Sequence, residues 1–471
     1  MPTNKSTGSI GKQSRPTENR CDATGRWKWF FSGCLLLVTV NLLRSWSTFS
    51  SIGLHMEDGL LFSRYYGNAL PITDIDGYFF GQPYKMVVTS FFAWIFAHFD
   101  VRSQPYMYLW TGFIWGTSAA CCFFASGLIR SRPVLLIGPL LVGLVGLNHI
   151  YYYNTLIFVM YTCLAVLLAL FFHPAPKTIF STLLFFIAFL FLPWAGPYSV
   201  AVIPAALLLL ILFWKDIEKK KRWLLLLSCS SAFVYYLNVR RGTSNIMGLQ
   251  NISIVKTYFS TLLERIIFFD QFSNVSPWFW LLFLGVVGGS FVHFRKDVVF
   301  LKNSLVMLAV LFGSFAVFYL SSKYPAYIHP KPCHSFLSSF FWCIYLLYLT
   351  DHFFQVYGEK KLTAVVFSIL VCAFIFVDNK KFSYRHKVKH PLPDTGAYVA
   401  AIHTMEQEEL EKNNQYVVMI QYGFPYVLLR PQVQVGSRSQ DALQIFRRNL
   451  PADLKPNFVA EHKIRLHAMK Q

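Results

Sequence analysis

Apolar residues gather in long segments along most of the chain, and short polar stretches separate these segments. Many of the segments approach the ~20 residues that an α-helix needs to cross a bilayer. The pattern therefore predicts an all-α polytopic membrane protein with about 11 transmembrane helices. The predicted spans lie near residues 29–43, 105–129, 133–150, 155–173, 178–193, 197–214, 223–238, 277–294, 299–321, 335–355 and 361–378.

The apolar stretch from Met86 to Phe99 is shorter, at about 14 residues, a length typical of interfacial segments. If it crossed the bilayer, the basic clusters at 130–132 and 215–222 would fall on the outer side. If it stays on the outer surface, every strong cluster faces the cytoplasm, as the positive-inside rule expects. We therefore predict a first-loop juxtamembrane helix over residues 86–99. The cytoplasmic loops then contain Arg130, Arg132, Lys177, Lys215, Lys219, Lys220, Lys221, Arg222, Arg295, Lys296, Lys360 and Lys361.

The same patterns divide the chain into three predicted parts. Residues 1–28 are polar and basic, which predicts a disordered cytoplasmic tail. Residues 29–378 form the multi-spanning domain. No long apolar run follows, so residues 379–471 are predicted to form a small extracytoplasmic α+β domain. This arrangement predicts a multi-pass protein of the plasma (inner) membrane, with a cytoplasmic amino terminus and an extracytoplasmic carboxyl terminus.

Three predicted outer loops are long, at 47–104, 239–276 and 322–334. Within the second, apolar and polar pairs alternate every four residues over 254–267, which predicts an amphipathic surface helix. In the carboxyl-terminal part, Asp394-Thr395 is a candidate cap for a helix that reaches about residue 412. Two further stretches are predicted strands, and they lie at 416–421 and 427–429.

Composition agrees with a membrane protein and argues against nucleic-acid binding. The chain contains 47 Phe and only 14% charged residues, against roughly a quarter in an average soluble chain. The formal net charge of +20 comes from Lys and Arg that gather in short loops, so the positive-inside rule explains it without nucleic acid. Most of the 9 Cys lie in apolar segments and show no zinc-binding spacing.

Two adjacent carboxylates, Glu57 and Asp58, follow the first apolar segment and precede Gly59. A carboxylate there can remove a proton from a sugar hydroxyl as a general base. The alternative is that one of them only caps the helix-like run from Leu60 to Tyr66. Asp74 and Asp76 have a D-x-D spacing that can hold a divalent cation such as Mg or Mn, and the alternative is a solvated turn.

Glu57-Asp58-Gly59, followed by Gly77-Tyr78, resembles the first outer loop of the GT-C superfamily of integral membrane glycosyltransferases. The resemblance covers this motif and the general architecture of the chain. It implies transfer of a sugar from a polyprenyl-phosphate carrier to a cell-envelope glycan, lipid or protein acceptor on the outer face of the bilayer. It also implies that Asp58 or Glu57 is the catalytic acid or base. Lys323-Tyr324 stands where such proteins have an Arg-Tyr pair.

A phosphate on the donor needs a cationic partner. The outer candidates are Lys323, Lys331, Arg240, Arg241 and His329, and lipid headgroups are the alternative partner for each of them. Two other functions stay open: a polysaccharide polymerase or ligase, and a non-enzymatic lipid-sugar flippase or transporter. Ion-coupled transporters place ionisable residues inside their spans, whereas the predicted spans here are almost free of them.

Overall fold

The structure is a computed structural model, and the parts of the chain that it describes are separated by gaps. The described residues are 23–44, 61, 85–99, 103–147, 156, 159–240, 277–320, 332–358, 368, 416–421, 424–429 and 465–468.

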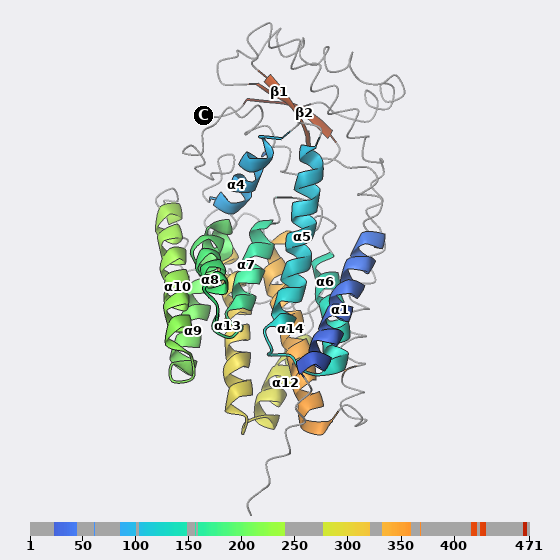
Figure 1. Cartoon of the computed structure of the whole chain (residues 1–471), viewed down its shortest axis with the longest axis vertical. Helices are drawn as coiled ribbons and strands as arrows, with labels where there is room; N and C mark the ends of the chain where they lie inside the picture. Colours follow the sequence, from blue (N-terminus) through green and yellow to red (C-terminus); the bar gives the residue numbers. More distant parts are fainter. Residues whose placement is uncertain are drawn as a thin grey trace, which may run out of the picture.

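Most described residues belong to α-helices, and most of these helices run along the long axis of the molecule (Figure 1). Shorter α4 lies near the end of the bundle that is closest to the β-strands. The helices are α1 (Ala23–Arg44), α4 (Val87–Phe96), α5 (Gln104–Ala125), α6 (Arg132–Leu147), α7 (Val159–Leu170), α8 (Ile179–Phe191), α9 (Val202–Phe213), α10 (Lys219–Arg240), α12 (Pro277–His293), α13 (Val298–Leu320) and α14 (Pro332–Tyr357), with 3-10 helices η4 (Leu192–Ala195) and η5 (Pro197–Ala201) between α8 and α9.

Side chains at the helix starts explain where several helices begin. The Thr178 hydroxyl accepts a hydrogen bond from the Ser181 N–H at 3.1 Å, and the Ser181 hydroxyl accepts one from the Thr178 N–H, which forms a capping box on α8. At α13 the Asp297 Oδ1 accepts from the Phe300 N–H at 2.9 Å. These bonds satisfy N–H groups that have no partner within their own helix.

The core is centred on α14, where every residue from 336 to 352 is buried. Helices α13, α6 and α7 pack against it. Helix α1 packs along α6, and Gly33 lies at their closest approach. A Cβ at position 33 would meet the carbonyl oxygen of Leu135 and would lie 2.7 Å from that of Leu136. Glycine is therefore needed for these two backbones to come this close.

Helix α8 presents large apolar side chains on its surface. Ile179 is 91% exposed and Phe180 is 70% exposed, whereas Phe189 of the same helix is fully buried. A large exposed apolar surface of this kind is typical of a region that binds another apolar surface. The other exposed apolar side chains of this helix are Leu183, Leu184, Phe186, Ile187 and Phe191.

The prediction of a polytopic membrane protein is wrong by this structure. Among the described residues, no helix combines the length and the apolar character that crossing a membrane requires. Helices α7 and α9 have only 12 residues each, against the ~20 that a span needs. Several longer helices carry polar groups: α10 begins with Lys219, and α14 contains Asp351. The predicted multi-pass location in the plasma membrane, with its cytoplasmic amino terminus and extracytoplasmic carboxyl terminus, is corrected for the same reason.

The predicted helices themselves lie close to where the apolar segments placed them. The stretch 86–99 contains α4, which ends at Phe96. The predicted segment 361–378 lies outside the described residues apart from Ser368, and so does the amphipathic helix predicted at 254–267. Of the tail predicted over residues 1–28, residues 1–22 lie outside them, and 23–28 are not a disordered tail, because they form the start of α1.

The carboxyl-terminal part contains three strands, β1 (Tyr416–Gln421), β2 (Phe424–Leu429) and β3 (Arg465–Ala468). β1 pairs with β2 in antiparallel fashion, and β2 pairs with β3 in parallel, so the order is β1-β2-β3. The predicted strand at 416–421 is confirmed, and the one predicted at 427–429 is the second half of β2. Only Tyr422 and Gly423 separate β1 from β2, a spacing typical of a hairpin. The helix predicted from about 395 to 412 lies outside the described residues.

Candidate functional site

Most of the site residues that the sequence predicted fall outside the part of the chain that the structure describes. Arg240 is the last residue of α10, and its side chain is not described. The described part of the chain therefore does not test whether the predicted site residues come together. Those outside the described residues are Glu57, Asp58, Asp74, Asp76, Arg241, Lys323, His329 and Lys331.

The described residues on either side of 62–84 pack into the protein core. Leu61 is 1% exposed and Met86 is 1% exposed, and both belong to the main hydrophobic cluster. The carbonyl oxygen of Lys85 accepts a hydrogen bond of 2.8 Å from the hydroxyl of Tyr235 on α10. These contacts place Leu61 and Lys85 firmly within the fold.

Several turns that contain basic residues lie at the end of the bundle opposite α4 (Figure 1). We call this region the basic end; it consists of the described turns at 126–131, 171–178, 214–218 and 294–297, with the helix ends beside them. Direct contacts join these turns. Lys220 donates to the carbonyl of Pro176 at 2.9 Å, and Lys302 lies 3.6 Å from Asp216. The clusters that the sequence predicted on one side thus come together in the fold, although no described helix could span a membrane.

Asp351 of α14 is a fully buried carboxylate at the basic end. Its Oδ1 accepts hydrogen bonds from the backbone N–H groups of Arg130 at 3.0 Å and Ser131 at 2.6 Å. These two residues immediately precede α6, so Asp351 holds the turn that leads into that helix from a distant part of the chain. Burial raises the pKa of the Asp351 carboxyl, and the hydrogen bonds from Ser131, Arg130 and Gln355 oppose that rise.

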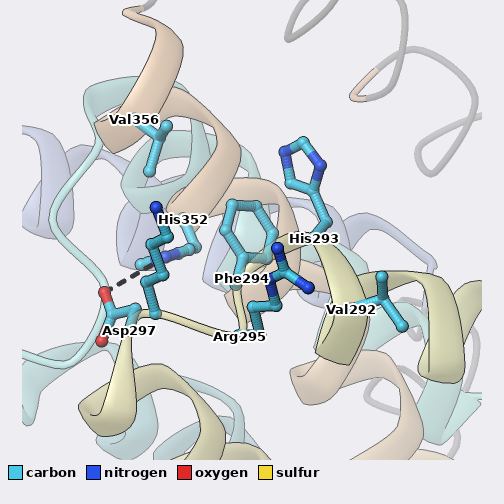
Figure 2. A pocket seen from close by; sticks show the side chains of 8 residues that line it. Val292, His293, Phe294, Arg295, Asp297, His352 and Val356 are labelled. Atoms are coloured by element: carbon cyan, nitrogen blue, oxygen red, sulfur yellow. Dashed lines mark ion pairs between the residues drawn. The ribbon is translucent and has the colours of Figure 1, made fainter.

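A pocket of about 570 Å³ opens at the basic end, between the α12–α13 turn and the last turns of α14. Figure 2 shows the Asp297 carboxylate and the His352 ring turned toward each other from these two elements. The lining combines cationic, imidazole and carboxylate groups with two valines. The lining residues are Val292, His293, Phe294, Arg295, Lys296, Asp297, His352 and Val356.

Aromatic rings and one carboxylate hold His352 in place. The His352 ring stacks on Phe300 with centroids 4.5 Å apart, and it meets Phe294 edge-on at 4.5 Å. Its Nε2 lies 3.4 Å from the Asp297 Oδ2. Burial lowers the pKa of His352; nearby Asp297 raises it and His293 lowers it. The neutral ring is therefore favoured more than in an exposed histidine.

The second histidine of the pocket is held by different partners. His293 lies against Phe294 on the side away from His352, with ring centroids 4.6 Å apart (Figure 2). Its Nε2 contacts the hydroxyl of Tyr357. The two imidazoles are therefore separated by the Phe294 ring, and they do not converge on one point. Among the described residues, no group of three or more His, Cys, Asp or Glu could hold a metal ion.

Comparison with known proteins adds no relative. No protein-family model, curated protein or solved structure matches this chain.

Sequence reasoning gave Arg295 and Lys296 only a topological role and did not consider Asp297 or His352 as site residues. The local signal was weak, because Asp297 and His352 lie in segments that are far apart in the sequence. The pocket exists only because the α12–α13 turn meets the end of α14. No local pattern predicts that contact.

Proposed function

We propose that this protein transfers a sugar from a polyprenyl-phosphate carrier to a glycan, lipid or protein acceptor. One observation carries the proposal: Glu57-Asp58-Gly59 followed by Gly77-Tyr78, the motif that resembles the GT-C glycosyltransferases. The motif stands in a chain with 23 Asp+Glu against 43 Lys+Arg.

Asp58 is the proposed general base. Its carboxylate takes the proton from an acceptor hydroxyl, the freed oxygen attacks the anomeric carbon of the sugar, and the bond from that carbon to the phosphate oxygen breaks. The electron pair of that bond leaves with the polyprenyl phosphate, so the step needs only the donor and the acceptor and no oxidant. Glu57 is the proposed helper, and it orients either the acceptor or Asp58.

The departing phosphate needs positive charge beside it. Asp74 and Asp76 would supply carboxylate oxygens to a divalent cation, which when bound offsets the negative charge of the phosphate. Cationic side chains are the other proposed partners of the phosphate. They are Lys323, Lys331, Arg240, Arg241 and His329.

The experiment is transfer of labelled sugar from a polyprenyl-phosphate donor by the purified full chain, measured for the wild type, Asp58→Asn and Glu57→Gln. Loss of a general base lowers the rate by roughly 10²–10⁴. A helix cap alone would instead cost about 1 kcal/mol of stability and leave the rate near normal. Thermal unfolding of each variant separates the two roles.

Asp216→Asn and Glu218→Gln are the matched controls. They remove the same charges from exposed side chains at the basic end, so their transfer rates should equal the wild-type rate. Normal transfer by both Asp58→Asn and Glu57→Gln would contradict the proposed roles. Absence of transfer by the wild type from every polyprenyl-phosphate sugar tested would contradict the function.

A further inference from the structure

The pocket at the basic end contains a buried imidazole nitrogen with no hydrogen-bond partner. The His352 side chain is only 10% exposed. Its Nε2 makes no hydrogen bond within the described part of the chain, although the Asp297 carboxylate lies 3.4 Å away. A buried polar atom without a partner costs free energy. His352 lines the pocket, so a ligand that binds there lies next to a polar group without a hydrogen-bond partner.

The charges around that nitrogen favour an anion. Arg295 and Lys296 line the same pocket, and both are exposed. Asp297 is the one carboxylate among the lining residues, so the two cations leave a positive balance before any protonation of histidine. A guanidinium and an ammonium beside an imidazole N–H are donors that bind phosphate oxygens.

Asp297 already has structural partners. Its Oδ1 accepts from the Phe300 N–H and caps α13, and its Oδ2 faces His352. The carboxylate lies beside the imidazole without a hydrogen bond to it, while Arg295 and Lys296 of the same turn remain accessible from outside.

We propose that this pocket binds a phosphomonoester group. Arg295 supplies the fork of N–H donors, Lys296 supplies a second positive charge, and His352 donates from Nε2 at the buried wall. Val292, which is 70% exposed, and Val356, which is 53% exposed, add apolar surface for whatever carries the phosphate. The pocket lies at the opposite end of the bundle from α4 (Figure 1), and its lining shares no residue with the proposed transferase centre.

Titration calorimetry of the full chain with inorganic phosphate at low ionic strength tests the site. The wild type should bind at one saturable site. Arg295→Gln and Lys296→Gln should each weaken binding about tenfold or more, the loss expected for one charge-assisted hydrogen bond. Both side chains are exposed, so these variants should fold normally. His352→Gln should weaken binding as well, provided its thermal unfolding matches the wild type.

Lys177→Gln is the matched control, because it removes one positive charge from an exposed side chain of the basic end that does not line the pocket. It should change the affinity by less than about twofold. Equal weakening by Lys177→Gln and Arg295→Gln would overturn the site, because it would show general attraction to positive charge.

The carrier of the phosphate is identified by a second probe, monomeric dihexanoyl phosphatidic acid. Binding at least tenfold tighter than inorganic phosphate supports the site and assigns it to a lipid headgroup. Equal affinity supports the site and assigns it to a free phosphate group. Failure of both probes to bind saturably overturns the proposal. The outcome of the sugar-transfer assay does not depend on any of these binding results.

Discussion

Lys221 shows at the scale of one residue how burial changes a charged group. Its ammonium donates a hydrogen bond of 2.5 Å to the carbonyl of His173, in the turn before α8. Burial lowers the pKa of Lys221 from 10.5 to about 8, against a small rise caused by Glu218. The folded protein therefore releases this proton more readily than the unfolded chain does.

This difference predicts a pH-dependent stability. Between pH of about 8 and 10.5 the unfolded chain keeps the Lys221 proton while the folded protein loses it. The unfolded state then binds more protons, so the contribution of Lys221 to the free energy of unfolding rises with pH across that window. Lys221→Gln should remove this rise, as measured by urea unfolding on either side of the folded-state pKa.

The exposed Lys177→Gln serves as the reference for the same series. The free energy of unfolding of this variant should keep the wild-type dependence on pH, because the Lys177 side chain is not buried. If Lys221→Gln and the wild type show the same dependence, the ammonium of Lys221 is not desolvated in the folded protein.

At the scale of the elements, Gly33 and Gly285 stand in opposite surroundings. A Cβ at position 33 in α1 would press on the carbonyl oxygens of Leu135 and Leu136 in α6. A Cβ at position 285 in α12 would meet nothing within 4 Å. Replacement of glycine by alanine should therefore change the free energy of unfolding in opposite directions at the two positions.

Gly33→Ala should lower the free energy of unfolding by about 1–3 kcal/mol, because α1 and α6 must move apart. Gly285→Ala should raise it by about 0.5–1 kcal/mol, because alanine favours the helix and costs no contact. Chemical unfolding of the two variants beside the wild type measures both. A destabilised Gly285→Ala would mean that the exposed face of α12 is covered by something.

How much of these elements the sequence predicts depends on how local their causes are. The apolar segments predict nearly all the described helices, because each segment is a run of neighbouring residues, and the β-branched run around Val417 predicts β1 in the same way. Crossing a membrane depends on the length of each helix and on the charges within it. Asp351 lies inside the predicted span 335–355, and Lys219 belongs to the helix that contains the predicted span 223–238. The pocket depends on His352 meeting Asp297, a contact that no local pattern predicts.

At the scale of the whole molecule, Asp351 joins parts of the chain that are far apart in sequence. Its carboxylate accepts from the N–H groups of Arg130 and Ser131, which are 221 and 220 residues away. It therefore fastens the end of α14 to the turn between α5 and α6, beside the pocket lined by His352.

Asp351→Ala should be strongly destabilising, by about 3 kcal/mol, because it leaves two backbone N–H groups without an acceptor. Asp351→Asn should cost less, because its amide oxygen can still accept. Thermal and chemical unfolding of both variants, with Gln355→Ala as a control for the neighbouring amide, measures the difference. A mild effect of Asp351→Ala would show that water reaches the Arg130–Ser131 turn and replaces the carboxylate.

The same carboxylate imposes a delay during synthesis. Ribosomes add roughly 5–20 residues per second, so Ser131 is made about 10–45 seconds before Asp351. Throughout that interval the turn that leads into α6 lacks the carboxylate that accepts from its N–H groups in the finished protein. This turn therefore waits for α14, the last of the described helices, and a ribosome that stalls before Asp351 leaves the two N–H groups open to other partners.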